Sequence, residues 1–144
     1  MMKLLTKYFN DIGLLVLRLG IGAIYIGHGA PKILGGPELW EKLGMAMGNL
    51  GITFMPTFWG FMAASSEFFG AIFLILGLLF RPATFFMAFT MTVAVIMHLS
   101  NGDGYTVFSH PLKGLVVFIA LFIMGPGKYA LDEKIAKFFN SDAQ

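Results

Sequence analysis

The fold is decided by residues 56–80, which read PTFWGFMAASSEFFGAIFLILGLLF and contain one charged side chain, Glu67. A helix that crosses the hydrocarbon core of a bilayer needs about 20 apolar residues, within a range of about 17–25. The stretch meets this requirement. Glu67 lies near its middle, where an ionisable group is costly and is therefore a candidate functional residue.

Three further apolar runs complete the predicted membrane domain. The four predicted spans cover residues 12–31, 56–80, 82–99 and 110–126. Composition agrees with spans, because 57% of the 144 residues are hydrophobic, 12% are charged and the mean hydropathy is +0.77. The last span is short, so an interfacial or re-entrant segment is the alternative there. We predict an all-α integral membrane four-helix bundle that forms a single domain over residues 1–144.

The segments between the spans carry turn and surface signals. A tight hairpin is expected at Arg81–Pro82, and Ser, Asn, Gly and Asp predict a loop at 100–104. Residues 31–55 show a weak helical pattern, which predicts a short amphipathic helix lying on the membrane. A second amphipathic pattern predicts that the tail, residues 128–144, lies along the cytoplasmic surface. The similar His–Gly endings of the first and third runs suggest two helical-hairpin repeats.

Loop cations predict the orientation of the chain. The side with both termini would hold Lys3, Lys7, Arg81, Lys128, Lys134 and Lys137, and the opposite side Lys32, Lys42 and Lys113. This excess favours both termini in the cytoplasm. The net charge of +2 and the lack of any basic run argue against a nucleic-acid partner. Because the chain has no cysteine, it offers no thiolate ligand for a metal or an iron–sulfur cluster.

Three polar residues from three predicted spans fall at one depth. At 1.5 Å per residue, His28 lies about 24 Å beyond the inner end of its span, Glu67 about 20 Å and His98 about 24 Å. Lys32 follows His28 by one helical turn. Arg18 lies deeper toward the cytoplasm, and either snorkels to the headgroups or points inward to a carboxylate or to ligand oxygens.

These residues favour a quinone as ligand. A quinone needs hydrogen-bond donors at its carbonyls and protons for its reduction, which histidine and a buried glutamate supply. No metal site is predicted, because no helix carries a paired-ligand spacing, although bis-histidine haem ligation between helices stays an open alternative. A protonated Glu67 that only bonds a neighbouring helix is the structural alternative.

The ordered motifs also resemble a known family. They are Leu17–Arg18–Leu19–Gly20, His28–Gly29, Lys32, Glu67–Phe68–Phe69–Gly70, Leu76–Gly77–Leu78, Arg81, His98, Asn101–Gly102, Gly125–Pro126–Gly127–Lys128–Tyr129 and Leu131–Asp132. Over nearly the whole chain, this set resembles the DoxX family of small bacterial membrane proteins. The resemblance implies four transmembrane helices, the bacterial inner membrane, and redox work such as that of thiosulfate:quinone oxidoreductase. The lack of cysteine departs from some relatives and puts thiol chemistry in doubt.

The preferred hypothesis is a membrane subunit of a quinone-linked redox system that acts with a partner oxidoreductase. Glu67, His28 and His98 would be catalytic, and Arg18 and Lys32 would bind the ligand. One alternative is a non-catalytic membrane anchor for a soluble redox enzyme, and another is a small proton-coupled transporter. Lipid contact is expected throughout, with a second subunit or another copy of the chain as partner. Whether the chain is itself an enzyme is left open.

Overall fold

The computed structural model describes residues 2–141, and these residues form helices and no strand. The order is α1 (Met2–Leu34), α2 (Gly36–Gly44), the 3-10 helix η1 (Met45–Leu50), α3 (Pro56–Leu76), α4 (Phe80–Ser100), α5 (Tyr105–Met124) and α6 (Leu131–Ser141). Within the described residues, four segments are long and apolar enough to cross a membrane, namely Thr6–Leu34 of α1 and the whole of α3, α4 and α5. The predicted all-α four-span membrane bundle is confirmed. Residues 142–144 of the predicted tail lie outside the described range.

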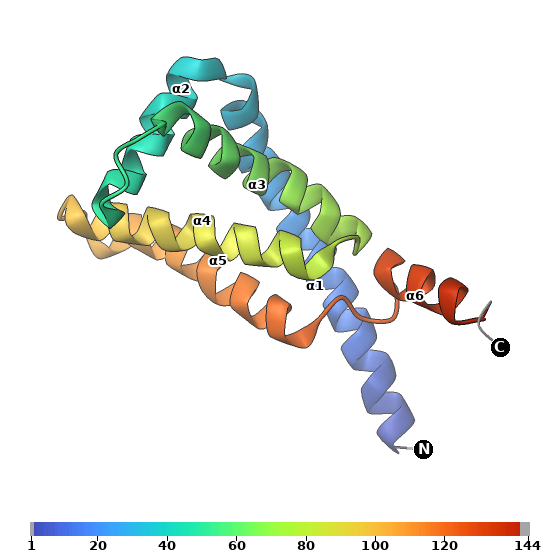
Figure 1. Ribbon diagram of the computed structural model, residues 1–144. Coiled ribbons are helices and arrows are strands. Elements are labelled where there is room, and N and C mark those ends of the chain that lie inside the picture. The colour runs from blue at the N-terminus through green and yellow to red at the C-terminus, as the bar shows by residue number, and fades with distance from the viewer. Residues whose placement is uncertain (1, 142–144) are drawn as a thin grey trace.

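The four spans form one packed bundle whose two ends differ (Figure 1). Helix α3 packs against α1, α2 and α4, and α5 packs against α4. Between the spans lies a core of fully buried side chains that includes Leu74, Phe80, Met87, Phe118 and Leu121. Helices α2 and η1 close the end of the bundle opposite both termini, and α6 lies at the end where α1 begins (Figure 1).

The amphipathic helix predicted within residues 31–55 exists as α2, and its place on the membrane surface stays a prediction. It packs backbone to backbone against the first half of α3. A Cβ atom on Gly44 would overlap the Pro56 carbonyl, and one on Gly60 would overlap the Trp40 carbonyl. Two glycines therefore let α2 approach α3 closely, in the way that small residues bring membrane helices together.

The span boundaries also differ from those predicted. Helix α1 runs on past Pro31 to Leu34, and α5 begins at Tyr105, which gives the fourth span its full length. The second span ends earlier, at Leu76, because Gly77 adopts the left-handed conformation (φ +65°) and the Leu78 amide bonds to the Phe73 carbonyl. This closing turn is a common helix ending. The predicted hairpin repeats stay a prediction.

Arg18 and Asp132 tie the ends of α3 and α4 together at the terminal end of the bundle. Arg18 is 1% exposed and donates to the carbonyls of Leu74 (2.9 Å), Ile75 (2.8 Å) and Pro126 (2.8 Å). The Asp132 carboxylate accepts from the amides of Leu79 (3.0 Å) and Phe80 (2.9 Å), at the start of α4. The Arg18 guanidinium thus lies at the C-terminal end of α3, where the helix dipole is negative. The Asp132 carboxylate lies at the N-terminal end of α4, where the helix dipole is positive.

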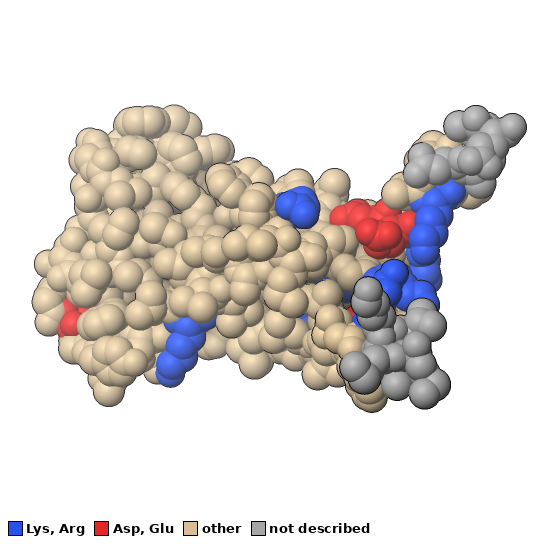
Figure 2. Space-filling model, turned by 90° about the horizontal axis from the view of Figure 1, so that it is seen from below, with Lys and Arg blue, Asp and Glu red and all other residues tan. Residues whose placement is uncertain are grey.

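Charge is distributed unevenly over the surface. In Figure 2 the lysine, arginine and acidic side chains gather mainly at the end of the molecule that carries α6, and most of the remaining face is uncharged. Large apolar side chains are exposed along the spans, among them Val16, Ile24, Phe69, Val116 and Ile123. Because these helices cross the bilayer, such side chains contact lipid.

Candidate functional site

A cavity of about 270 Å³ lies between α3 and α4, near the end closed by α2 and η1. Most of the residues that line it are apolar, and its polar residues are Lys32, Trp59, Ser66, Glu67, Thr90 and His98. Met62 of α3 and Phe86 and Phe89 of α4 also line it and are exposed at the surface of membrane-spanning helices. The cavity is therefore accessible from the lipid side, between α3 and α4.

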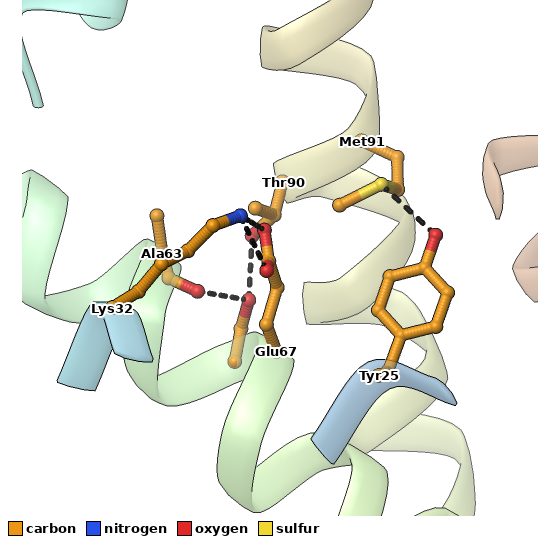
Figure 3. Close-up of polar contacts among 7 residues, drawn as sticks. Tyr25, Lys32, Ala63, Glu67, Thr90 and Met91 are labelled. Atoms are coloured by element: carbon orange, nitrogen blue, oxygen red, sulfur yellow. Dashed lines mark hydrogen bonds and ion pairs between the residues drawn. The ribbon is translucent and has the colours of Figure 1, made fainter. Parts of the chain in front are cut away.

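Lys32 and Glu67 form an ion pair in the wall of this cavity (Figure 3). The Lys32 ammonium lies 2.7 Å from Oε1 and 2.6 Å from Oε2 of Glu67, so it bridges both carboxylate oxygens. The Glu67 side chain is 5% exposed and that of Lys32 is 33% exposed. The Trp40 indole of α2 donates to the Lys32 carbonyl at 2.9 Å, which anchors α2 beside the pair. The buried carboxylate therefore has the partner that its low-dielectric position requires.

Two further polar features surround the pair. The hydroxyls of Ser66 and Thr90 lie 2.6 Å apart and join α3 to α4, and Ser66 also donates to the Ala63 carbonyl at 2.9 Å. Figure 3 shows Thr90 beside Lys32 and Glu67. The Trp59 indole nitrogen is buried and has no hydrogen-bond partner, although Trp59 lines the cavity. A buried donor without a partner is costly, so this N–H group is suited to a ligand acceptor.

His98 enters the same cavity from the end of α4. Its Nδ1 atom lies 2.7 Å from Oδ2 of Asp103, a residue of the following loop. The side chains are 24% and 34% exposed, so this pair lies nearer to solvent than the Glu67 carboxylate. The imidazole and its carboxylate thus connect the polar part of the cavity with the loop surface.

Of the five residues predicted for the site, three come together. Glu67, Lys32 and His98 line one cavity. His28 does not line it, because its side chain is exposed on α1 and contacts the Tyr25 ring edge-on. The predicted trio of Glu67, His28 and His98 therefore does not line one cavity, and the haem alternative stays a prediction.

Arg18 is also absent from the residues that line the cavity. The predicted snorkelling to the headgroups is wrong, because the guanidinium points inward, and its partners there are backbone carbonyls and not a carboxylate. Arg18 is 1% exposed and donates hydrogen bonds to three backbone carbonyls. Its role is to hold the end of α3, away from the cavity.

Several residues of the site were missed by the sequence reading. Asp103 carries a weak signal, since Gly102 can close the end of α4 and return the next residue over His98. Trp59 and Thr90 carry none, because tryptophan and threonine are ordinary in apolar helices. Among residues 2–141, no three histidine or acidic side chains gather in a way that would hold a metal ion.

Comparisons with known proteins agree on one family. The DoxX family model matches residues 13–99. The chain is 30% identical over 137 residues to inner membrane protein YqjF of Escherichia coli strain K12, and this match covers 91% of the chain and 98% of the relative. No solved structure matches the chain.

Proposed function

The chain belongs to the DoxX family of membrane proteins, and from this premise we propose that it is the membrane subunit of a quinone-linked redox system. One observation carries the proposal. A buried ion pair, Lys32–Glu67, stands in the wall of a mainly apolar cavity that membrane lipid can reach. Ionisable groups at this depth are costly, and they commonly mark a ligand or proton path.

The residues present fit a quinone. The Lys32 ammonium and the unpaired Trp59 indole N–H are donors for its carbonyl oxygens. Met62, Phe86 and Phe89 provide an apolar passage for an isoprenoid tail toward the lipid. When bound, a quinone supplies two-electron, two-proton redox chemistry. Glu67 balances the charge of Lys32 and fixes its position, and His98 is the residue of the cavity best suited to exchange a proton.

A partner is required for electron transfer. The chain has no cysteine for an iron–sulfur cluster and no glycine-rich strand–helix motif for a flavin or nicotinamide nucleotide. A separate oxidoreductase subunit would then hold the centre that exchanges electrons with the quinone. In this proposal the chain contributes the quinone site and the proton path.

We place the chain in the bacterial inner membrane with both termini in the cytoplasm. Supporting this orientation, Lys32 is paired with Glu67, so the unpaired cations predicted for the opposite side reduce to Lys42 and Lys113. Because the chain lacks cysteine, single Gly102→Cys and Lys128→Cys variants can be labelled selectively in whole cells whose outer membrane is permeabilised. A membrane-impermeant maleimide should label the first variant and spare the second. The reverse pattern would overturn the orientation.

The quinone proposal is tested by mass spectrometry of small molecules extracted from the purified protein. The parent should carry a quinone, and Glu67→Gln and Lys32→Met should lose it. His28→Ala is the matched control, since His28 lies at a similar predicted depth but outside the cavity, and it should retain the quinone. Bulk lipid alone in all four preparations, each verified as folded, would refute the quinone site and favour the anchor hypothesis.

A further inference from the structure

Asp103 is held against His98 by the turn that ends α4. Gly102 adopts the left-handed conformation (φ +73°), its amide bonds to the Leu99 carbonyl (3.1 Å), and the Asp103 amide bonds to the His98 carbonyl (3.0 Å). This turn returns the Asp103 side chain over the imidazole, where Oδ2 lies 2.7 Å from Nδ1. Backbone geometry, and not chance contact between two mobile side chains, fixes the pair.

The pair decides which nitrogen of His98 carries the proton. An ionised carboxylate only accepts hydrogen bonds, so Nδ1 must be the donor to Asp103. In the neutral imidazole the other nitrogen, Nε2, is then an acceptor. His98 lines the cavity and Asp103 does not, so Nε2 is the nitrogen left for a ligand there. The other ionisable residues that line the cavity, Lys32 and Glu67, are paired with each other.

We propose that Asp103 is a positioning residue that makes the cavity selective for the reduced ligand, a hydroquinone. This inference rests on the proposed quinone site. A hydroquinone hydroxyl can donate to Nε2, whereas a quinone carbonyl offers Nε2 no hydrogen. Asp103 therefore favours the reduced form whenever His98 is neutral.

The same geometry gives His98 a defined proton step. Nε2 accepts the proton as a hydroquinone O–H bond breaks, and Asp103 stays ionised and stabilises the imidazolium. Two such transfers, with two electrons passed to an oxidised redox centre of the partner oxidoreductase, convert one hydroquinone to one quinone. After each transfer the imidazolium loses its Nε2 proton to water, which reaches the His98 side chain because it is 24% exposed, and the Nδ1–H tautomer is restored.

The tautomer is tested first, by nitrogen NMR of histidine-labelled full-length protein in detergent micelles. The chain has three histidines, so a His98→Gln variant assigns the signals of His98. At a pH where these signals show a neutral ring, the parent should carry its proton on Nδ1. Asp103→Asn should move the proton to Nε2, because the amide can donate to Nδ1, and Asp103→Glu should restore the parent pattern. Glu41→Gln, which removes an exposed charge from α2, is the control and should change nothing.

Selectivity is tested at the same pH, without oxygen, from dissociation constants for decylubiquinol and decylubiquinone. The parent and Glu41→Gln should prefer the quinol, and Asp103→Asn should reduce this preference by about tenfold, the order expected for one hydrogen bond. Binding of both forms with no change of preference or of tautomer in Asp103→Asn would overturn the role of Asp103 and leave the quinone site intact. Failure of both forms to bind the parent would instead refute the proposed function.

Discussion

Replacing Arg18 with methionine should destabilise the bundle more than any other single change of charge at that end. Arg18 is 1% exposed, and its Nε, Nη1 and Nη2 atoms each donate to a different backbone carbonyl. Methionine fills much of the same volume but donates nothing. The end of α3 and the segment after α5 would therefore lose their shared cation.

The expected loss follows from these three bonds. The Leu74 carbonyl belongs to a fully buried residue, and leaving such a group unpaired costs about 1–3 kcal/mol. The carbonyls of Ile75 and Pro126 belong to partly exposed residues and each lose about 0.5–1.5 kcal/mol. We expect a total near 4 kcal/mol, within a range of about 2–6 kcal/mol. Arg18→Lys should lie between the parent and Arg18→Met, because an ammonium lacks the planar fork of a guanidinium.

Thermal unfolding in detergent measures this effect, with the fluorescence of the chain's two tryptophans as the signal. Arg18→Met should lower the Tm by roughly 10–15 °C, at about 3 °C per kcal/mol. Arg81→Met is the control, since it removes the same charge from an exposed side chain whose contact with the Phe122 ring spans 5.6 Å. That variant should cost less than about 1 kcal/mol. Equal falls in Tm for the two variants would show that the three Arg18 hydrogen bonds do not stabilise this end of the bundle.

Three further predictions concern packing and charge. Asp132→Ala should lower the free energy of unfolding by about 1–2 kcal/mol, because the amides that begin α4 lose their cap. Thermal unfolding measures this loss, and an unchanged Tm would contradict the cap. Gly60→Leu should separate α2 from α3 and weaken decylubiquinone binding, whereas Gly20→Ala, which has open space around it, should not; equal affinities would contradict the close contact. Lys32→Met should lower the free energy of unfolding by about 3–5 kcal/mol, because it leaves the Glu67 carboxylate buried without a partner, and adding Glu67→Met should restore most of this stability. A double variant no more stable than Lys32→Met would show that the two residues do not form a buried ion pair.

The sequence predicted the spans well because span length and apolar composition are properties of the chain alone. It placed the end of the second span and the start of the third less well. The end of α3 depends on Gly77, and the start of α4 depends on Asp132, a residue distant in the chain. The place of α2 on α3 likewise depends on two glycines that meet only in the folded bundle.

Only part of the candidate site could be predicted from the sequence, and the reason is geometric. Counting residues along a helix gives depth in the membrane, and depth alone brought Glu67, His28 and His98 together. It gives no reliable direction around the helix axis when neighbours are unknown, so the count could not show that His28 faces away from the cavity. The partners of Arg18 are backbone carbonyls, which cannot be predicted from a pattern of side chains in the sequence. Lys32 was predicted one helical turn beyond His28, but its bond to Glu67 appears only when α1 is packed on α3.

The most direct test of the account is photolabelling of the purified protein with an azido-benzoquinone, followed by peptide mass spectrometry. The account predicts labels on cavity residues of α3 and α4, such as Met62, Phe89 and Met97, that unlabelled decylubiquinone removes by competition. Glu67→Gln should lose these labels, and His28→Ala should keep them. Labels spread along the lipid-facing sides of all four spans, unchanged by competitor or by Glu67→Gln, would contradict a quinone site in this cavity.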